Sequence, residues 1–182
     1  MNSFTHLKLI KQTGRGFFYA LYCEGEEYSE FGAFLREYGN HPEFEFIRAI
    51  IKQLHRRVIG ESNMNEYPFF RPEGALIAIP GKDDNDGIVA GSEIGLRLFC
   101  FMPNNKTLVY LNGYHHNGIT CDYNVHPNYA HKARRITQAV NGIKKAESLG
   151  YIKLAPTGGY YEDDALRILI RNKEEFNLTE YL

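Results

Sequence analysis

Two β-rich segments around a short polar turn are the feature that most constrains the fold of this chain. The segments are GLRLFCFM at residues 95–102 and TLVYLNGY at residues 107–114. Between them, PNNK at residues 103–106 has the polar composition of a tight turn. The pattern predicts a β-hairpin, so any fold of this chain has to accommodate this antiparallel pair.

The segments before the hairpin predict one strand and two helices. FFYALYC at residues 17–23 is aromatic and uncharged, as expected of a buried strand. Ser29 has the chemistry of an N-cap for the short helix that follows it. Asn40 and Glu43 have the spacing of a capping box for a longer helix, which we expect to reach about residue 59.

The remaining segments complete an α+β class. Residues 76–79 predict a strand, and residues 127–149 predict a third long helix with one apolar face. YIKLA at residues 151–155 is strand-like, whereas residues 164–171 fit either a strand or a helix. Strands and helices do not alternate in this order, which is typical of an antiparallel sheet. We expect a single domain over residues 1–182.

Composition excludes several classes of protein. The N-terminus lacks the apolar stretch of a signal peptide, and no segment has the roughly 20 apolar residues of a membrane span, so we expect a cytoplasmic protein that binds no membrane.

Cys23, Cys100 and Cys121 include no CxxC pair, which predicts reduced thiols and no zinc site. His126 and His131 are five residues apart, a spacing that does not suit one helix face, so we expect no metal.

The near-neutral net charge of -1 hides an uneven distribution along the chain. Residues 97–150 carry a net charge of +5, against -5 for residues 61–96 and -2 for residues 151–182. The basic segment also holds four of the seven histidines and several tyrosines. Cations interleaved with aromatic rings are typical of single-stranded RNA binding, because charges neutralise phosphates and rings stack on bases. A solvated helix face with ordinary strand aromatics is the alternative.

The end of the second hairpin strand carries the best candidates for acid–base chemistry. Alternation places Tyr114 and His116 on one face of the strand and His115 on the other. Histidine serves as a general acid or base near neutral pH. Polar residues that simply end a strand are the alternative interpretation.

Five further residues are candidates for RNA binding. Lys132, Arg134 and Arg135 lie in the first turns of the third helix, where the helix dipole disfavours cations. We interpret this placement as a sign of an anionic partner. Lys106 in the hairpin turn and Tyr129 at the start of the helix would add a charge and a stacking ring.

Three stretches in this order resemble the RelE/HigB superfamily of toxin–antitoxin toxins, most closely the branch of phage-derived HigB-like toxins. They are FGAFLREYGNHPEFEFIRAIIKQLH, GLRLFCFMPNNKTLVYLNGYHH and HPNYAHKARRITQA, and the resemblance covers roughly residues 28–140. It implies a RelE-like α+β fold, with N-terminal helices packed on one side of a twisted antiparallel sheet. Residues 1–150 would form this core, and residues 151–182 would be a C-terminal extension of helix or strand.

The resemblance also implies a function. It implies metal-independent cleavage of mRNA, typically on the ribosome, without a cofactor, and inhibition by a cognate antitoxin protein; we expect no binding to DNA by the chain itself. By position, Arg97 and Arg135 would stabilise phosphate charge, and Tyr114 would stack on a base. His115 and His116 stand where the family has paired lysines and would supply the acid and base. A non-catalytic protein-interaction or RNA-binding protein on the same fold is the alternative.

Overall fold

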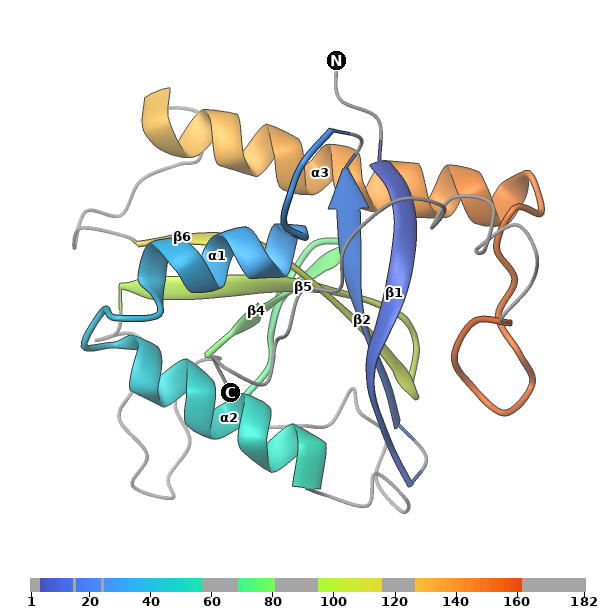
Figure 1. Ribbon diagram of the computed structural model, residues 1–182, viewed down its shortest axis with the longest axis horizontal. Coiled ribbons are helices and arrows are strands. Elements are labelled where there is room, and N and C mark those ends of the chain that lie inside the picture. The colour runs from blue at the N-terminus through green and yellow to red at the C-terminus, as the bar shows by residue number, and fades with distance from the viewer. Residues whose placement is uncertain are drawn as a thin grey trace.

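The residues that the structure describes form a mixed six-stranded sheet and three helices (Figure 1). The computed structural model describes residues 4–14, 16–23, 25–56, 69–80, 95–115 and 127–161. The elements, in chain order, are β1 (Phe4–Thr13), β2 (Gly16–Cys23), α1 (Glu30–Tyr38), α2 (Phe44–Arg56), β3 (Arg71–Glu73), β4 (Leu76–Ile79), β5 (Leu96–Asn104), β6 (Thr107–His115) and α3 (Pro127–Ser148). The predicted α+β class is therefore confirmed.

The predicted hairpin is formed by β5 and β6, which pair antiparallel. Its turn is shorter than expected, because Asn104 pairs with Thr107 and leaves only Asn105 and Lys106 between the strands. The side chain of Asn104 accepts a hydrogen bond from the Lys106 amide at 2.9 Å, which holds the tight turn.

The sequence predicts an antiparallel sheet, but the sheet is mixed. Its strand order is β1-β2-β6-β5-β4-β3, and β2 lies parallel to β6. A parallel pair requires a long crossover connection, which here contains α1, α2 and β3 to β5. Local sequence pattern carries no signal for such a distant pairing.

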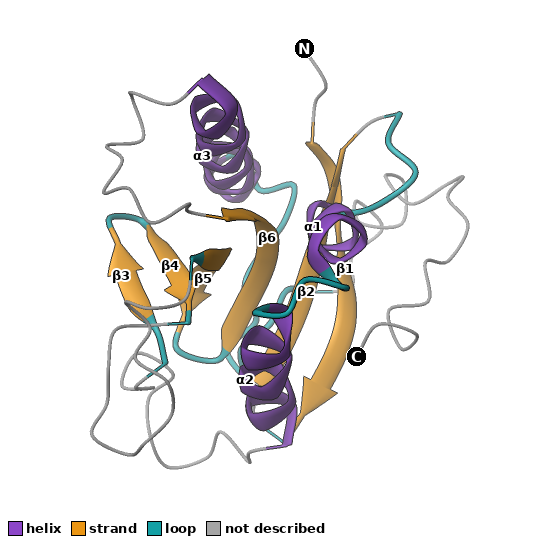
Figure 2. Cartoon of the chain, turned by 90° about the vertical axis from the view of Figure 1, so that its left-hand side faces the viewer, coloured by secondary structure: helices purple, strands orange, loops and turns teal. Residues whose placement is uncertain are grey.

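Helices cover both faces of the sheet, which corrects the one-sided arrangement implied by the resemblance. In β2, Phe18 and Ala20 pack against α1 and α2, whereas Tyr19 and Leu21 belong to the core beneath α3. Figure 2 shows the curved sheet between α2 and α3. The alternation follows from the period-2 geometry of a strand that is buried on both faces.

The starts of α1 and α2 differ in how well the sequence predicted them. Ser29 caps α1 as predicted, its hydroxyl accepting from the Gly32 amide at 2.9 Å. The capping box of Asn40 and Glu43 is wrong, because the Glu43 carboxylate contacts β5 and β6 instead. The ring of His41 takes the local role, since its Nδ1 accepts from the Glu43 amide at 3.2 Å.

Several smaller expectations can be compared with the structure. The strand at residues 76–79 and the helix beginning at Pro127 are confirmed, whereas β1 and β3 were not predicted. Residues 151–155 form only an isolated bridge, between Leu154 and Tyr160. The segment 164–171 lies outside the described residues. None of the helices described is both long and apolar enough to cross a bilayer.

An irregularity near the end of β6 determines the directions of its last side chains. Leu98 pairs with Gly113 and Cys100 with Tyr110, so β6 carries one extra residue at this point. A Cβ atom at Gly113 would lie 2.0 Å from the Arg97 carbonyl oxygen, so only glycine allows this approach. The bulge therefore determines the face of the sheet from which the His115 side chain projects.

Candidate functional site

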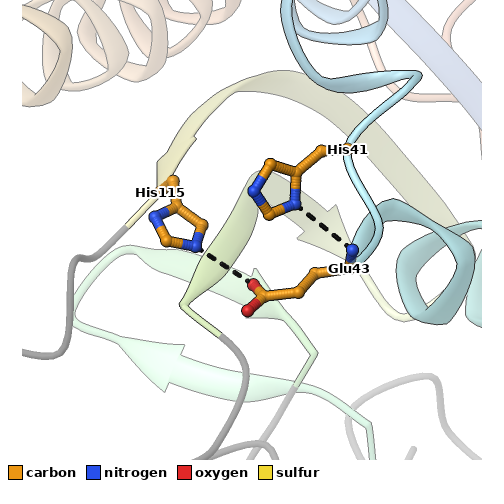
Figure 3. Close-up of side chains that lie close together, drawn as sticks. All are labelled: His41, Glu43 and His115. Carbon is orange, nitrogen blue, oxygen red and sulfur yellow. Dashed lines mark hydrogen bonds and ion pairs between the residues drawn. The ribbon is translucent and has the colours of Figure 1, made fainter.

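Two histidines and a glutamate meet where β6 ends. Glu43, just before α2, accepts a hydrogen bond from the Leu96 amide at 2.8 Å through Oε2. The same oxygen lies 3.3 Å from Nε2 of His115. The ring of His41 lies beside that of His115, with ring centroids 4.7 Å apart (Figure 3). We call His41, Glu43 and His115 the His–Glu–His cluster.

The three residues of the His–Glu–His cluster are each partly exposed to solvent. The side chains of His115 and Glu43 are 26% and 27% exposed, so a ligand can reach them without unfolding the chain. Because Nε2 of His115 faces a carboxylate, this nitrogen carries the proton and Nδ1 carries the lone pair in the neutral ring.

Arg97 pairs with Tyr114 in the sheet and is not part of the cluster. Its side chain is only 8% exposed, and its Nη1 donates to the Leu96 carbonyl at 3.0 Å. Burial and then Arg71 lower the pKa of Arg97, while Glu43 and Glu73 act in the opposite direction. Arg97 can thus add positive potential near Glu43, but its burial does not suit the direct phosphate contact that we predicted.

Tyr114 lies on the opposite face of the sheet from His115, as the alternation predicted for these two residues. Its side chain is 1% exposed and packs against Phe99, with ring centroids 5.2 Å apart. A ring buried to this extent does not suit the stacking on a base that the resemblance implies for Tyr114. His116 lies outside the described residues.

A cavity lies on the α3 face of the sheet. It has a volume of about 700 Å³. Tyr114 and Arg134 both line it, so two of the predicted residues share this cavity. Its lining also includes the apolar side chains of Leu76, Phe99 and Ile136 and the polar side chains of Glu73, Thr137 and Gln138.

The other predicted RNA-binding residues do not converge on one surface. Lys132 is paired with Glu37, with its Nζ 2.5 Å from Oε2, and also donates to the Tyr38 hydroxyl at 3.2 Å. Lys106 lies in the turn at the opposite end of β6 from His115, roughly 30 Å away along an extended strand. Tyr129 belongs to α3, but its side chain lies outside the described part of the chain.

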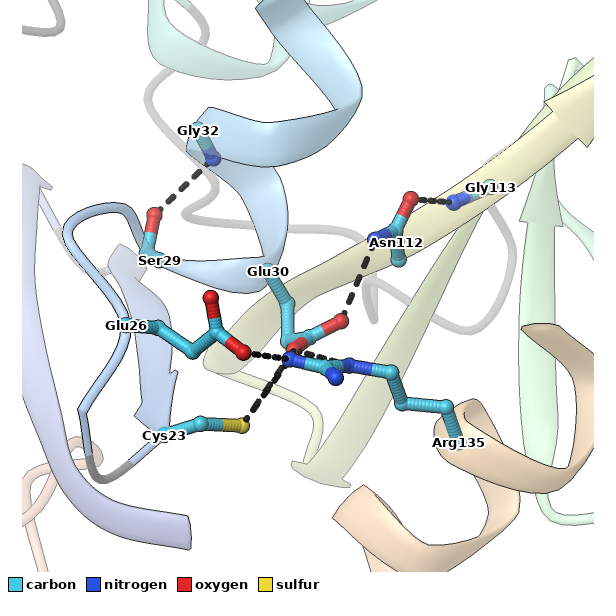
Figure 4. Close-up of polar contacts among 8 residues, drawn as sticks. All are labelled: Cys23, Glu26, Ser29, Glu30, Gly32, Asn112, Gly113 and Arg135. Atoms are coloured by element: carbon cyan, nitrogen blue, oxygen red, sulfur yellow. Dashed lines mark hydrogen bonds and ion pairs between the residues drawn. The ribbon is translucent and has the colours of Figure 1, made fainter. Parts of the chain in front are cut away.

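The Arg135 side chain is 30% exposed and reaches into a gap between two strands. β2 pairs with β6 only as far as Ala20 and Tyr110, and polar side chains occupy the space beyond (Figure 4). There Nε of Arg135 donates to the Glu30 carboxylate at 2.7 Å, and Asn112 donates to the same carboxylate at 3.1 Å. The Glu30 side chain is 3% exposed, so this is a buried ion pair.

Cys23 belongs to the same polar group. Its thiol donates to Glu30 at 3.3 Å, and Nη2 of Arg135 lies 3.4 Å from its sulfur. Burial, followed by the nearby Glu30 charge, raises the pKa of Cys23 to about 12. The hydrogen bond with Glu30 raises the pKa of Arg135 above its already high value. Cys23 is therefore an unreactive thiol, and Arg135 is a permanent cation that holds α1 to α3.

Comparison with known proteins identifies no relative. No protein-family model, curated protein or solved structure matches the chain. The resemblance to RelE/HigB toxins therefore stays a prediction from the sequence.

His41 and Glu43 are the functional candidates that sequence reasoning missed. Both lie more than 50 positions before His115, and Glu43 also has the spacing of a capping box with Asn40. One signal was available, because a histidine and a glutamate two residues apart in an irregular segment can point to the same side.

Proposed function

We propose that this chain cleaves RNA at the His–Glu–His cluster, as a toxin-like endoribonuclease. The observation that carries the proposal is the pair of adjacent imidazoles at a solvent-accessible strand end, one of them oriented by a carboxylate. Two histidines suffice for general acid and general base, and the 2′-hydroxyl of RNA supplies the nucleophile.

The reaction would be an internal transfer of the phosphodiester. Nδ1 of His115 takes the proton of the 2′-hydroxyl, and the 2′-oxygen attacks the adjacent phosphorus. The bond from phosphorus to the 5′-oxygen breaks, and His41, whose Nδ1 no longer accepts from the Glu43 amide once the ring is protonated, gives the proton of Nε2 to that oxygen. The products are a 2′,3′-cyclic phosphate and a 5′-hydroxyl. Glu43 stabilises the His115 imidazolium that forms, and the buried charge of Arg97 favours the anionic phosphate.

Substrate and partners follow from the resemblance alone. We propose mRNA as the substrate, with cleavage on the ribosome, no metal or cofactor in the reaction, and inhibition by a cognate antitoxin protein. Expression of the intact chain should then arrest growth, and co-expression of an antitoxin encoded next to it should restore growth.

The test is cleavage of a short RNA by the purified full chain, with and without EDTA. Replacing either histidine of the cluster (H41A or H115A) should lower the rate about 10²-fold or more, and E43Q should lower it less. H131A is the matched control, because His131 is an exposed histidine of α3 outside the cluster. Unchanged rates in both cluster variants would refute the assignment, and so would loss of activity in H131A alone.

The alternative is a non-catalytic protein that binds RNA or another protein. Specific observations favour it, since Arg97 and Tyr114 are buried and Lys132 and Arg135 are held in ion pairs. Under this alternative the chain binds RNA without cutting it, or binds no RNA at all. RNA binding whose affinity falls steeply with salt, without cyclic-phosphate products, would support the binding protein.

A further inference from the structure

The His–Glu–His cluster also has the composition of a transition-metal site. Two imidazoles and one carboxylate are the protein ligands of several catalytic zinc sites, in which a fourth position stays open. Imidazole nitrogens favour Zn²⁺, Co²⁺ and Ni²⁺ over Mg²⁺ or Ca²⁺, which prefer oxygen ligands. The residue types alone therefore select one class of ion.

The distances in the cluster agree with such an ion. On a tetrahedral zinc with bonds of about 2.0–2.1 Å, neighbouring ligand atoms lie about 3.3–3.4 Å apart. Nε2 of His115 and Oε2 of Glu43 are already 3.3 Å apart. With a ring nitrogen of His41, all three ligand atoms lie within 4.8 Å of one another. Small side-chain rotations would bring the third atom into range.

The backbone around the cluster holds two of its members in place. Glu43 is fixed by the Leu96 amide, and His41 by the Glu43 amide. Because these hydrogen bonds already restrict the two side chains, less conformational entropy is lost when a metal binds. The positive charge of Arg97 disfavours a metal cation in the cluster, although the negative charge of Glu73 offsets part of the Arg97 charge. Three ligands at a partly exposed site suggest a dissociation constant on the order of micromolar, weaker than closed four-ligand sites.

We propose that the His–Glu–His cluster binds one Zn²⁺-type ion, and that the bound ion stops RNA cleavage. The ion would replace the proton between His115 and Glu43. Coordination through Nε2 leaves the ring proton on Nδ1, which is the nitrogen that accepts the 2′-hydroxyl proton in the proposed reaction. The second half of this proposal rests on the proposed function, whereas the first half does not.

The binding half is tested without RNA, on the full chain carrying no histidine tag. Titration with Co²⁺ should give visible absorption bands that saturate at one ion per chain, and Zn²⁺ should displace them while Mg²⁺ should not. The variants H41A, E43Q and H115A should each weaken Zn²⁺ binding tenfold or more in calorimetry, and H131A should not. Far-UV circular dichroism checks that each variant is folded. If a histidine variant does not fold, the E43Q variant is used in its place.

Binding that persists unchanged in all three cluster variants would overturn the proposal, as would saturation without any ligand-field bands. The inhibition half is tested by adding Zn²⁺ to the cleavage reaction, where activity should fall with a midpoint at the measured dissociation constant. Activity that is unaffected by a bound ion, or that requires it, would overturn the inhibition half. If the chain cleaves no RNA under any condition, the proposed function fails, and the Co²⁺ titration still decides the metal site.

Discussion

Replacing Arg135 by alanine separates a structural role for this residue from the RNA-binding role that its sequence position suggested. Arg135 donates to Glu30 across the gap between β2 and β6, and the Glu30 side chain is almost fully buried. Alanine would leave that carboxylate without its cation. The change therefore tests whether the third helix is held to α1 by this pair.

The expected loss of stability can be worked from the geometry. Removing one partner of a buried ion pair costs about 3–5 kcal/mol. Three features reduce this value here: Arg135 is 30% exposed, Asn112 still donates to Glu30, and Glu30 stands in the first turn of α1, where the helix dipole favours a carboxylate. We expect R135A to lower the free energy of unfolding by about 2–3 kcal/mol, which corresponds to a fall in Tm of about 5–10 °C.

The assay is urea-induced unfolding followed by far-UV circular dichroism, because the chain has no tryptophan. R134A is the matched control, since Arg134 is its exposed neighbour and should change stability by no more than about 0.5 kcal/mol. The double variant R135A/E30Q should be more stable than the sum of the single changes predicts, with a coupling of about 1–2 kcal/mol.

R135K serves if R135A does not fold, because lysine keeps the charge but loses the two-nitrogen contact. The reasoning would be refuted if R135A unfolded at the same urea concentration as the wild type while losing affinity for RNA. That result would return Arg135 to the role predicted from the sequence.

Three further predictions concern pH, packing and salt. Burial, with a smaller effect from Lys11, lowers the pKa of His55 to about 4, so below about pH 6.5 the unfolded chain binds a proton that the folded chain does not. The free energy of unfolding should therefore fall by up to about 3 kcal/mol between pH 6.5 and pH 4. In the H55Q variant the free energy of unfolding should lose most of this dependence on pH. Gly113 has no room for a methyl group, so G113A should lose at least about 3 kcal/mol, and a smaller loss in the same denaturation assay would contradict the close approach to Arg97. If RNA is bound as a single strand over α3, R134A should reduce the slope of log affinity against log salt by about 0.7, and an unchanged slope would place RNA elsewhere.

The elements that could be predicted from sequence are those whose signals are local. The β5–β6 hairpin, the Ser29 cap and the long α3 each depend on residues within a few positions of one another. The parallel pairing of β2 with β6 joins residues about 90 positions apart, and no local pattern encodes it. The edge strand β1 does carry a weak alternation around Leu7 and Lys8, but nothing in its sequence names its partner.

The candidate site was half predicted for the same reason. His115 was recognised because it ends a strand with a clear pattern. Glu43 was assigned to a capping box, which is a local interaction of about 1 kcal/mol. In the folded chain the Leu96 amide and the His115 imidazole both contact the Glu43 carboxylate. These two contacts from β5 and β6 outweigh the single contact expected at the helix start. Tertiary partners of this kind become visible only once the strands are in place.

Two of the cations of α3 have anionic partners within the chain itself. Cations in the first turns of a helix oppose its dipole, which indicated an anion nearby. The anions are in the same chain, because Glu37 pairs with Lys132, and Glu30 pairs with Arg135. The formal charge of +5 over residues 97–150 therefore overstates the positive charge available to RNA. Any RNA bound over α3 has to use exposed cations such as Arg134, and its affinity should fall less steeply with salt than the formal charge suggests.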